Sequence, residues 1–210
     1  MKTLIALAFA LFLPFAAPLA AQAQPNDGSP EGLVRQVTTD VLDAIKSDTG
    51  LQAGDKQKAL ALAEKKVLPH LDFTEMTRLA AGRSWNSAPP EQRERLVSAF
   101  RAMLVRTYAN AIDVYRGQTM MVEPARVPTS ATEATVRNRY VSPGRRPTPV
   151  EYTMRKGADG WKIYDIVVDG ISLVLTYRSQ FEETARVSGM EGLIAQLQDK
   201  TKVQPALKGR

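Results

Sequence analysis

The chain has no cysteine and one histidine, His70, among its 210 residues. A chain without cysteine has no disulfide, no thiol nucleophile and no thiolate metal site, and a single histidine excludes multi-histidine metal centres. The glycine-rich fingerprints of phosphate loops and dinucleotide sites are also missing. A Ser-His-Asp triad would have to use His70, which follows Pro69 at a helix end and is better interpreted as a solvated or capping histidine. The sequence therefore indicates no metal and no cofactor.

Neither sign of charge dominates strongly, because 28 Lys and Arg stand against 22 Asp and Glu, which gives a formal net charge of +6. With 44% apolar and 24% charged residues, the composition is typical of a water-soluble globular protein of one ordinary domain. A mildly basic surface favours anionic partners, and nucleic acid, phospholipid headgroups and acidic proteins are the candidates.

Basic residues cluster at three places in the sequence: Lys65-Lys66, Arg93 with Arg95, and Arg145-Arg146. A nucleic-acid surface would combine such charge with aromatic platforms or a recognition helix, and the sequence shows neither. We therefore expect no nucleic-acid partner. A solvated surface and a docking patch for an acidic partner or acidic headgroups both stay open.

The first 23 residues have the pattern of a secretory signal peptide. Lys2 is followed by an apolar run from Leu4 to Ala20 and by the small-x-small triplet Ala21-Gln22-Ala23. Pro14 and Pro18 interrupt the run, which makes it a poor membrane anchor, and no cysteine follows that could carry a lipid anchor. We expect a soluble extracytoplasmic protein with one domain over residues 24–200 and a flexible tail over 201–210.

Apolar residues three and four positions apart predict helices in both halves of the chain. The predicted helices cover residues 30–48, 55–68, 73–81, 90–115, 172–189 and 191–200. Asp72 is expected to cap the third of these and Gly82 to end it, while Pro69 ends the second. The chain thus has a helical part at 29–116 and another at 172–200.

Between the helices, the period changes to that of β-strands. Four short segments rich in β-branched and aromatic residues lie between Pro, Gly or Asp turns, at residues 120–125, 135–141, 150–155 and 161–168. In the middle strands apolar and charged side chains alternate, with Val136 and Tyr152 on one face and Arg137, Arg139 and Arg155 on the other. This predicts an α+β fold in which helices enclose a curved four-stranded antiparallel sheet. The inner face of that sheet is a candidate wall for an apolar cavity.

Two aspartates are the best candidates for catalysis. Asp165 and Asp169 flank the apolar segment Ile166-Val167-Val168, where a carboxylate can be partly desolvated. In a small cone-shaped fold, such an Asp could move a proton with a tyrosine donor nearby, for which the candidates are Tyr140, Tyr152 and Tyr164. The alternative is that Asp169-Gly170 is simply a turn.

Methionines are spread through elements that should face one another: Met76, Met103, Met120, Met121 and Met154. Flexible thioethers suit a surface that adapts to varied hydrocarbon, although stripes of this kind more often form core.

Five blocks of sequence, in this order and at these spacings, resemble the MlaC, or toluene-tolerance auxiliary, family. They are Val67–Phe73, Trp85 followed by Glu91-Gln92-Arg93, Phe100–Ala109, Gly160–Val174 and Tyr177–Phe181. The resemblance covers about residues 29–200. Asp169 stands where the family often has Glu, Thr176 where it often has Asn, and Pro89 where it usually has a hydroxyl residue.

The resemblance implies a soluble periplasmic phospholipid carrier that maintains the lipid asymmetry of the outer membrane. In such proteins a helical part and a sheet like that of the nuclear-transport-factor-2 superfamily enclose an apolar pocket for acyl chains. The implied partners are a diacyl phospholipid, an outer-membrane lipoprotein-porin complex and an inner-membrane ATP-binding-cassette transporter. The family has no catalytic motif, so the resemblance implies that the chain is not an enzyme.

Apolar and aromatic positions of the predicted elements are expected to supply much of the pocket wall. The candidates are Phe73, Met76, Phe100, Leu104, Tyr108, Val136, Tyr140, Tyr152, Met154, Ile163, Ile166, Val168, Val174 and Tyr177. Arg137 or Arg178 is a candidate contact for the lipid headgroup. A proton-shuttling enzyme of the same superfamily and a carrier or chaperone of lipoproteins stay open as alternatives.

Overall fold

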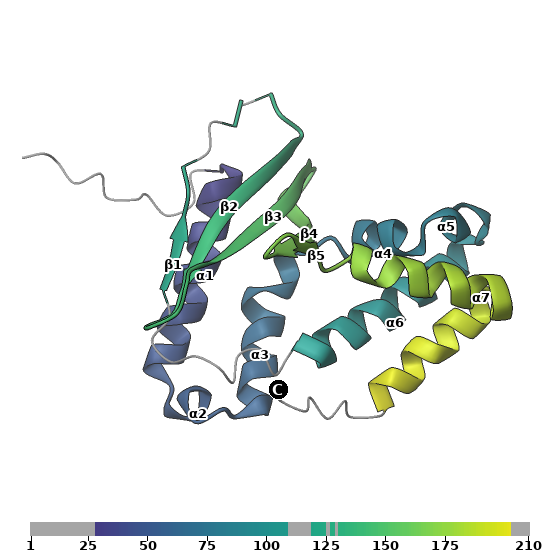
Figure 1. Ribbon diagram of the computed structural model, residues 1–210, viewed down its shortest axis with the longest axis horizontal. Helices are drawn as coiled ribbons and strands as arrows, with labels where there is room; N and C mark the ends of the chain where they lie inside the picture. The colour runs from purple at the N-terminus through teal and green to yellow at the C-terminus, as the bar shows by residue number, and fades with distance from the viewer. Residues whose placement is uncertain (1–27, 109–118, 125–126, 129, 203–210) are drawn as a thin grey trace, which may run out of the picture.

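The computed structural model describes residues 28–108, 119–124, 127–128 and 130–202 (Figure 1). The predicted signal peptide, the part of the predicted long helix beyond Tyr108 and residues 203–210 of the predicted tail lie outside these residues. Within the described part of the chain, no helix is long and apolar enough to cross a membrane.

The helices begin and end where the sequence supplies caps and breakers. Ser29 Oγ accepts a hydrogen bond from the Gly32 N–H at 2.9 Å, and Asp72 accepts one from the Glu75 N–H at 2.9 Å. The helical elements of the first half are α1 (Pro30–Ser47), α2 (Thr49–Gln52), α3 (Lys56–Lys66), η1 (Leu68–His70), α4 (Phe73–Ala81), α5 (Arg83–Ser87) and α6 (Pro90–Tyr108). The predicted helices correspond to α1, α3, α4 and α6. The four or five residues of α2 and α5 are too few to show a helical period.

Among the residues that the structure describes, five antiparallel strands follow, each hydrogen-bonded to the next in chain order. They are β1 (Thr119–Val122), β2 (Glu133–Val141), β3 (Thr148–Gly157), β4 (Gly160–Val168) and β5 (Ile171–Ser172). The α+β class with an antiparallel sheet is confirmed, but the prediction of four strands is wrong by one. Because β5 has two residues, it carries no readable alternation.

The last helices begin later than the sequence predicted. Ser172, predicted to begin a helix, instead lies in β5, and the 3₁₀ turn η3 (Leu175–Tyr177) leads into α7 (Arg178–Lys202). Strand pairing of Ser172 with Val167 overrides the helical period at this point. Gly189, at φ 67°, interrupts α7 where two separate helices were expected to meet.

The two faces of the sheet differ as the alternation predicted. Val136 and Asn138 are buried on one face of β2, whereas Arg137 and Arg139 project from the other face and pair with Glu151 at 3.3 Å and Glu123 at 2.7 Å. A β-bulge lies between β3 and β4, where the pairing of Thr153 with Asp165 is followed by that of Met154 with Ile163. The extra residue, Tyr164, puts Ile163 and Ile166 on the same face although they are three positions apart.

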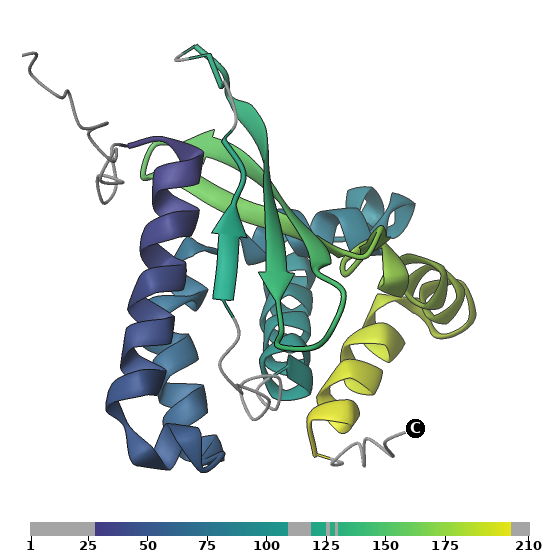
Figure 2. The same ribbon diagram turned by 60° about the vertical axis from the view of Figure 1, so that its left-hand side comes forward.

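The molecule has two halves with separate hydrophobic clusters. α1 lies along β1 and β2 on the buried face of the sheet, with α3 beside it (Figure 2). The cluster there contains Leu33, Val34, Val136, Met154, Trp161 and Ile163. The other half consists of α4, α5, α6 and α7, whose core is built around Phe100, Phe181 and Leu193 (Figure 1).

Polar contacts join the two halves at β3 and β4. The Asp72 N–H, at the start of α4, donates to the Ile163 carbonyl at 2.8 Å, and Arg155 donates to the Asp72 carboxylate at 2.8 Å. Arg155 also lies 3.3 Å from the carboxylate of Glu75, which pairs with Arg78. These contacts fix the N-terminus of α4 against the sheet.

Candidate functional site

An apolar cavity of about 240 Å³ lies between α1 and the inner face of the sheet. One face of α1 supplies half of its wall, because positions 33, 34, 37, 38, 41, 42 and 45 recur at helical spacing. The residues lining it are Leu33, Val34, Val37, Thr38, Val41, Leu42, Ile45, Val67, Leu71, Met120, Tyr140, Tyr152, Ile163 and Ile166. No Asp, Glu, Lys, Arg or His from the described part of the chain is among them, so the wall suits a neutral hydrocarbon ligand.

The polar groups of the wall are three hydroxyls. Thr38, on α1, donates to the Sδ of Met120 on β1 at 3.4 Å. Burial raises the pKa of the Tyr152 hydroxyl to about 12, and the nearby Tyr140 adds to this rise. Tyr152 therefore remains neutral at physiological pH and adds polarity to the β2–β3 side of the cavity without adding charge.

α1 forms ion pairs with α3 and mainly apolar contacts with the sheet. The Lys66 ammonium lies 2.7 Å from the Asp40 carboxylate, and that of Lys58 lies 2.8 Å from Asp48, at the end of α1. Toward the sheet, α1 presents aliphatic side chains and the Thr38 hydroxyl. The charged contacts of α1 are thus made with α3, and the two helices are referred to as the α1–α3 unit.

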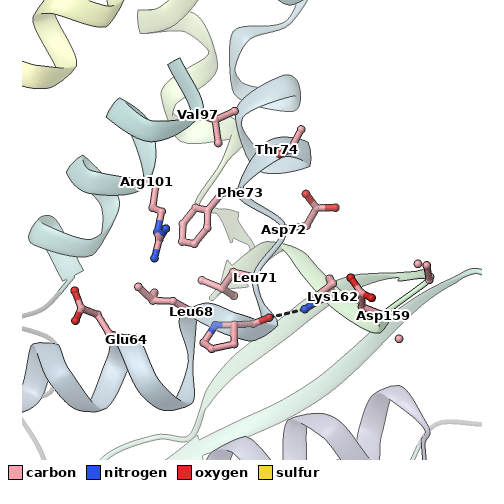
Figure 3. Close-up of a pocket in the computed structure, with 14 residues that line it drawn as sticks. Glu64, Leu68, Leu71, Asp72, Phe73, Thr74, Val97, Arg101, Asp159 and Lys162 are labelled. Atoms are coloured by element: carbon pink, nitrogen blue, oxygen red, sulfur yellow. Dashed lines mark hydrogen bonds between the residues drawn. The ribbon is translucent and has the colours of Figure 1, made fainter. Parts of the chain in front are cut away.

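A wider groove of about 570 Å³ lies on the other side of η1, between α3, α6 and the β3–β4 turn. Figure 3 shows that its wall mixes apolar side chains with charges of both signs, including Glu64, Asp159 and Lys162. The Lys162 ammonium donates to the Pro69 carbonyl at 2.6 Å, and the Arg101 guanidinium lies 5.5 Å from the centre of the Phe73 ring. Although this groove is larger, its charges make it a poor site for hydrocarbon, and we take the cavity under α1 as the candidate site.

The structure brings four of the predicted wall residues together in this cavity: Tyr140, Tyr152, Ile163 and Ile166. Two more, Val136 and Met154, are fully buried in the adjoining cluster between α1 and the sheet. Six others lie in or against the core of the helical half: Phe73, Met76, Phe100, Leu104, Val174 and Tyr177. Tyr108 and Val168 are exposed at the ends of their elements.

Sequence reasoning missed the contribution of α1 to the cavity. Its stripe of Leu33, Val34, Val37, Val41, Leu42 and Ile45 is visible in the sequence as a helical packing face. A period shows which face is apolar, but it does not show whether the face meets solid core or an open space. Val67 and Leu71 were not predicted either, whereas Met120 was named among the methionines suited to hydrocarbon but was not included in the predicted wall.

The two candidate catalytic aspartates have structural roles. Asp165 accepts hydrogen bonds from the Ser172 hydroxyl at 2.6 Å and from the backbone N–H groups of Ile166 at 2.8 Å and Val174 at 3.2 Å. These three donors fix the segment between β4 and η3. Asp169 is exposed, has φ 51° in the turn before β5, and lies 3.6 Å from Arg146 of the β2–β3 turn. Neither residue lines the cavity.

The candidate headgroup contacts lie outside the cavity wall. Arg137 is on the solvent face of β2 with Glu151, and Arg178 pairs with Glu182 at 3.2 Å on the first turn of α7. In the part of the chain that the structure describes, no group of three or more Asp, Glu and His side chains is placed to hold a metal ion.

Comparisons with known proteins agree on one family. The model of the MlaC protein family matches residues 35–199, which is more than half of the chain. The chain is 26% identical over 163 residues to toluene tolerance protein ttg2D of Pseudomonas putida, over 77% of this chain and 75% of that protein. It is 22% identical over 173 residues to the intermembrane phospholipid transport system binding protein MlaC of Haemophilus influenzae, over 81% of each.

A solved structure extends this likeness to the fold. The phospholipid-binding protein from Ralstonia solanacearum, in complex with a phospholipid at 1.53 Å resolution, matches with a TM-score of 0.75 and 35% sequence identity. The match covers 82% of this chain and 96% of that one.

Proposed function

Because this chain belongs to the MlaC family, we propose that it binds phospholipid and carries it between membranes as part of the Mla lipid transport system. The observation that supports this most directly is the cavity under α1, whose wall is aliphatic and aromatic and contains no charged side chain from the described residues. The relatives named for phospholipid binding and the phospholipid complex of the Ralstonia protein support the same ligand class.

A carrier of this kind needs no chemical step. Each methylene group moved from water into an apolar site gains about 0.8 kcal/mol, so the two chains of a phospholipid face a barrier of about 20 kcal/mol or more in water. Transfer from a bilayer to an apolar cavity is close to neutral, since hydrocarbon surrounds the chains in both places. Direction must then come from different affinities for the donor and acceptor complexes at the two membranes. A protein without catalytic groups is sufficient for this role.

The cavity must widen when lipid enters. Its volume of about 240 Å³ is below the range of about 300–1,000 Å³ that is usual for sites of drug-sized ligands, and a diacyl lipid is larger than these. The ion pairs between α1 and α3, together with the apolar contact between α1 and the sheet, favour opening by separation of α1 from β1 and β2. We therefore propose that the α1–α3 unit moves as a body to admit the chains.

The location and partners follow from the proposed role. We propose that the protein is released into the periplasm after removal of residues 1–23 and receives or delivers lipid at two membrane complexes. These are an outer-membrane lipoprotein-porin complex and an inner-membrane ATP-binding-cassette transporter, and the transporter supplies the energy.

Native mass spectrometry of the protein from a periplasmic extract, prepared without detergent, tests the ligand directly. We expect adducts at phospholipid masses, together with uptake of lipid from vesicles. Val37→Trp fills part of the cavity from α1 and should lower the amount of bound lipid several-fold without unfolding the protein. Val187→Trp, at an exposed position on α7, is the matched control and should leave binding unchanged.

Two results would overturn the proposal. One is a protein that carries no lipid and takes none from vesicles. The other is preferential binding of an acylated peptide when it competes with phospholipid, which would identify a lipoprotein carrier instead.

A further inference from the structure

Asn138, in the middle of β2, has a buried side chain without a hydrogen-bond partner. It pairs with Val122 of β1 and Val150 of β3, and it is 2% exposed. Neither its Oδ1 nor its Nδ2 has a partner among the residues that the structure describes. An unpaired buried amide destabilises a fold, whereas an aliphatic side chain of similar shape would be accepted at such a position. Packing alone therefore gives no reason for an asparagine here.

The side chain of Asn138 lies on the face of the sheet that forms the cavity. Alternation along β2 puts it on the same face as Tyr140, two residues away, which lines the cavity. Because Asn138 pairs with Val150, Tyr152 is its diagonal neighbour on β3, within reach of a long side chain. Tyr152 also lines the cavity. Asn138 is not itself among the residues that line the cavity, so its buried amide lies beside the tyrosines of the wall, on the same face of the sheet, and reaches a ligand only when the cavity widens.

The charges around this position select the kind of group that it can bind. The cationic neighbours of Asn138 on β2, Arg137 and Arg139, project to the opposite face, where they pair with Glu151 and Glu123. A phosphate placed beside Asn138 would be buried without a cation, which is unfavourable. A neutral acceptor such as a carbonyl oxygen would instead satisfy the amide N–H and the phenol O–H without any charge.

We propose that Asn138 and Tyr152 form a polar subsite that donates hydrogen bonds to an ester carbonyl of the bound lipid. This inference rests on the proposed function, since it assigns a second contact type within the same cavity. The ester groups are the polar atoms nearest to the acyl chains, so they enter the cavity when the chains are fully inserted. The subsite then fixes how deeply the glycerol end of the lipid enters the cavity. The aliphatic wall holds the acyl chains without selecting one kind of chain over another.

The experiment compares ester and ether lipids, which differ in the carbonyl alone. The protein is equilibrated with vesicles of equimolar diacyl and dialkyl phosphatidylglycerol with equal chain lengths, and native mass spectrometry gives the ratio of the two adducts. We expect the wild-type protein to prefer the diacyl lipid about fivefold, which corresponds to about one hydrogen bond. Asn138→Leu and Tyr152→Phe should each bring this ratio closer to one, because each removes one of the two donors.

Tyr164→Phe is the matched control, because Tyr164 packs against the helical half and does not line the cavity. It should keep the wild-type preference. If Asn138→Leu fails to fold, Tyr152→Phe decides the question, since it keeps the aromatic ring. Equal binding of both lipids by the wild-type protein, or a preference that survives both substitutions, overturns the subsite and leaves the carrier function standing. A wild-type protein that binds neither lipid overturns the proposed function instead.

Discussion

Thr38 on α1 and Met120 on β1 contact each other across the cavity wall, with the threonine Oγ1 3.4 Å from the methionine Sδ. The contact joins the α1–α3 unit to an edge strand of the sheet, and it is a weak hydrogen bond because sulfur is a poor acceptor. The ion pairs of Asp40 in α1 and of Asp48 at its C-terminal cap are made with α3. Separation of α1 from β1 therefore breaks little besides apolar contacts.

Joining these two positions should hold the cavity closed and so slow lipid exchange. In a Thr38→Cys, Met120→Cys protein, a short thiol-reactive cross-linker should slow lipid exchange with vesicles at least about tenfold, because α1 can no longer separate from β1. The native chain has no cysteine, so the linker reacts at these two sites only.

A cross-link within the α1–α3 unit is the control. An Asp40→Cys, Lys66→Cys protein joined in the same way should exchange lipid at the rate of its unlinked form, since this pair moves as one body. Rapid exchange by the Thr38–Met120 linked protein would contradict the opening between α1 and the sheet.

Core positions and cavity positions should respond differently to truncation. Leu104, in the core of the helical half, is 5% exposed, and Leu104→Ala should lower the free energy of unfolding by about 2–5 kcal/mol. The lipid bound per folded molecule should stay unchanged.

Ile166 borders the cavity, so Ile166→Ala should lower the free energy of unfolding by less, about 1–2 kcal/mol, and should also lower lipid retention. Urea unfolding and native mass spectrometry measure the two effects, and a loss of bound lipid in Leu104→Ala would place that residue in the wall.

Removal of the Asp165 carboxylate should destabilise the protein without affecting lipid binding by the folded fraction. Asp165→Ala leaves the buried Val174 N–H without its acceptor and frees the segment before η3, and we expect a loss of about 3 kcal/mol in urea unfolding. Asp169→Asn keeps a residue that tolerates φ 51° and should change stability by less than about 1 kcal/mol. Equal effects of the two substitutions would contradict the structural role of Asp165.

The free energy of unfolding should fall in acid because of the cluster formed by Glu75, Arg78 and Arg155. The hydrogen bond from Arg78 and the charge of Arg155 lower the pKa of the Glu75 carboxyl below its ordinary value of 4.5. Because the folded state favours the ionised form, this contribution is fully present above pH 4.5 and is lost as the pH falls through the lower, folded-state pKa.

The free energy of unfolding of Glu75→Gln, measured between pH 7 and pH 3, should therefore depend less on pH than that of the wild-type protein. Glu183→Gln, which removes an exposed pair with Arg186 on α7, is the control and should follow the wild-type curve closely. Parallel curves for the wild-type protein and Glu75→Gln would show that the cluster does not contribute.

The sequence predicted the longer elements well because their signals are local. The hydroxyl of Ser29 and the carboxylate of Asp72 cap α1 and α4 wherever these helices pack, and Pro69 cannot continue α3. Alternation on β2 likewise put Val136 inside and Arg137 outside. The short elements β5, α2 and α5 depend on tertiary contacts, and their few residues show no period.

The sequence by itself determined the class of fold, the inner face of each long element and the family, since hydrophobic period and blocks of residues are properties of the chain alone. Only the tertiary structure decided which apolar faces meet solid core and which enclose a space. Phe100 and Tyr152 were both predicted to line the pocket, but α7 packs on the first, whereas α1 stands away from the second and leaves a cavity. That difference depends on the distance between packed elements, which is set by side chains far apart in the chain and has no local signal.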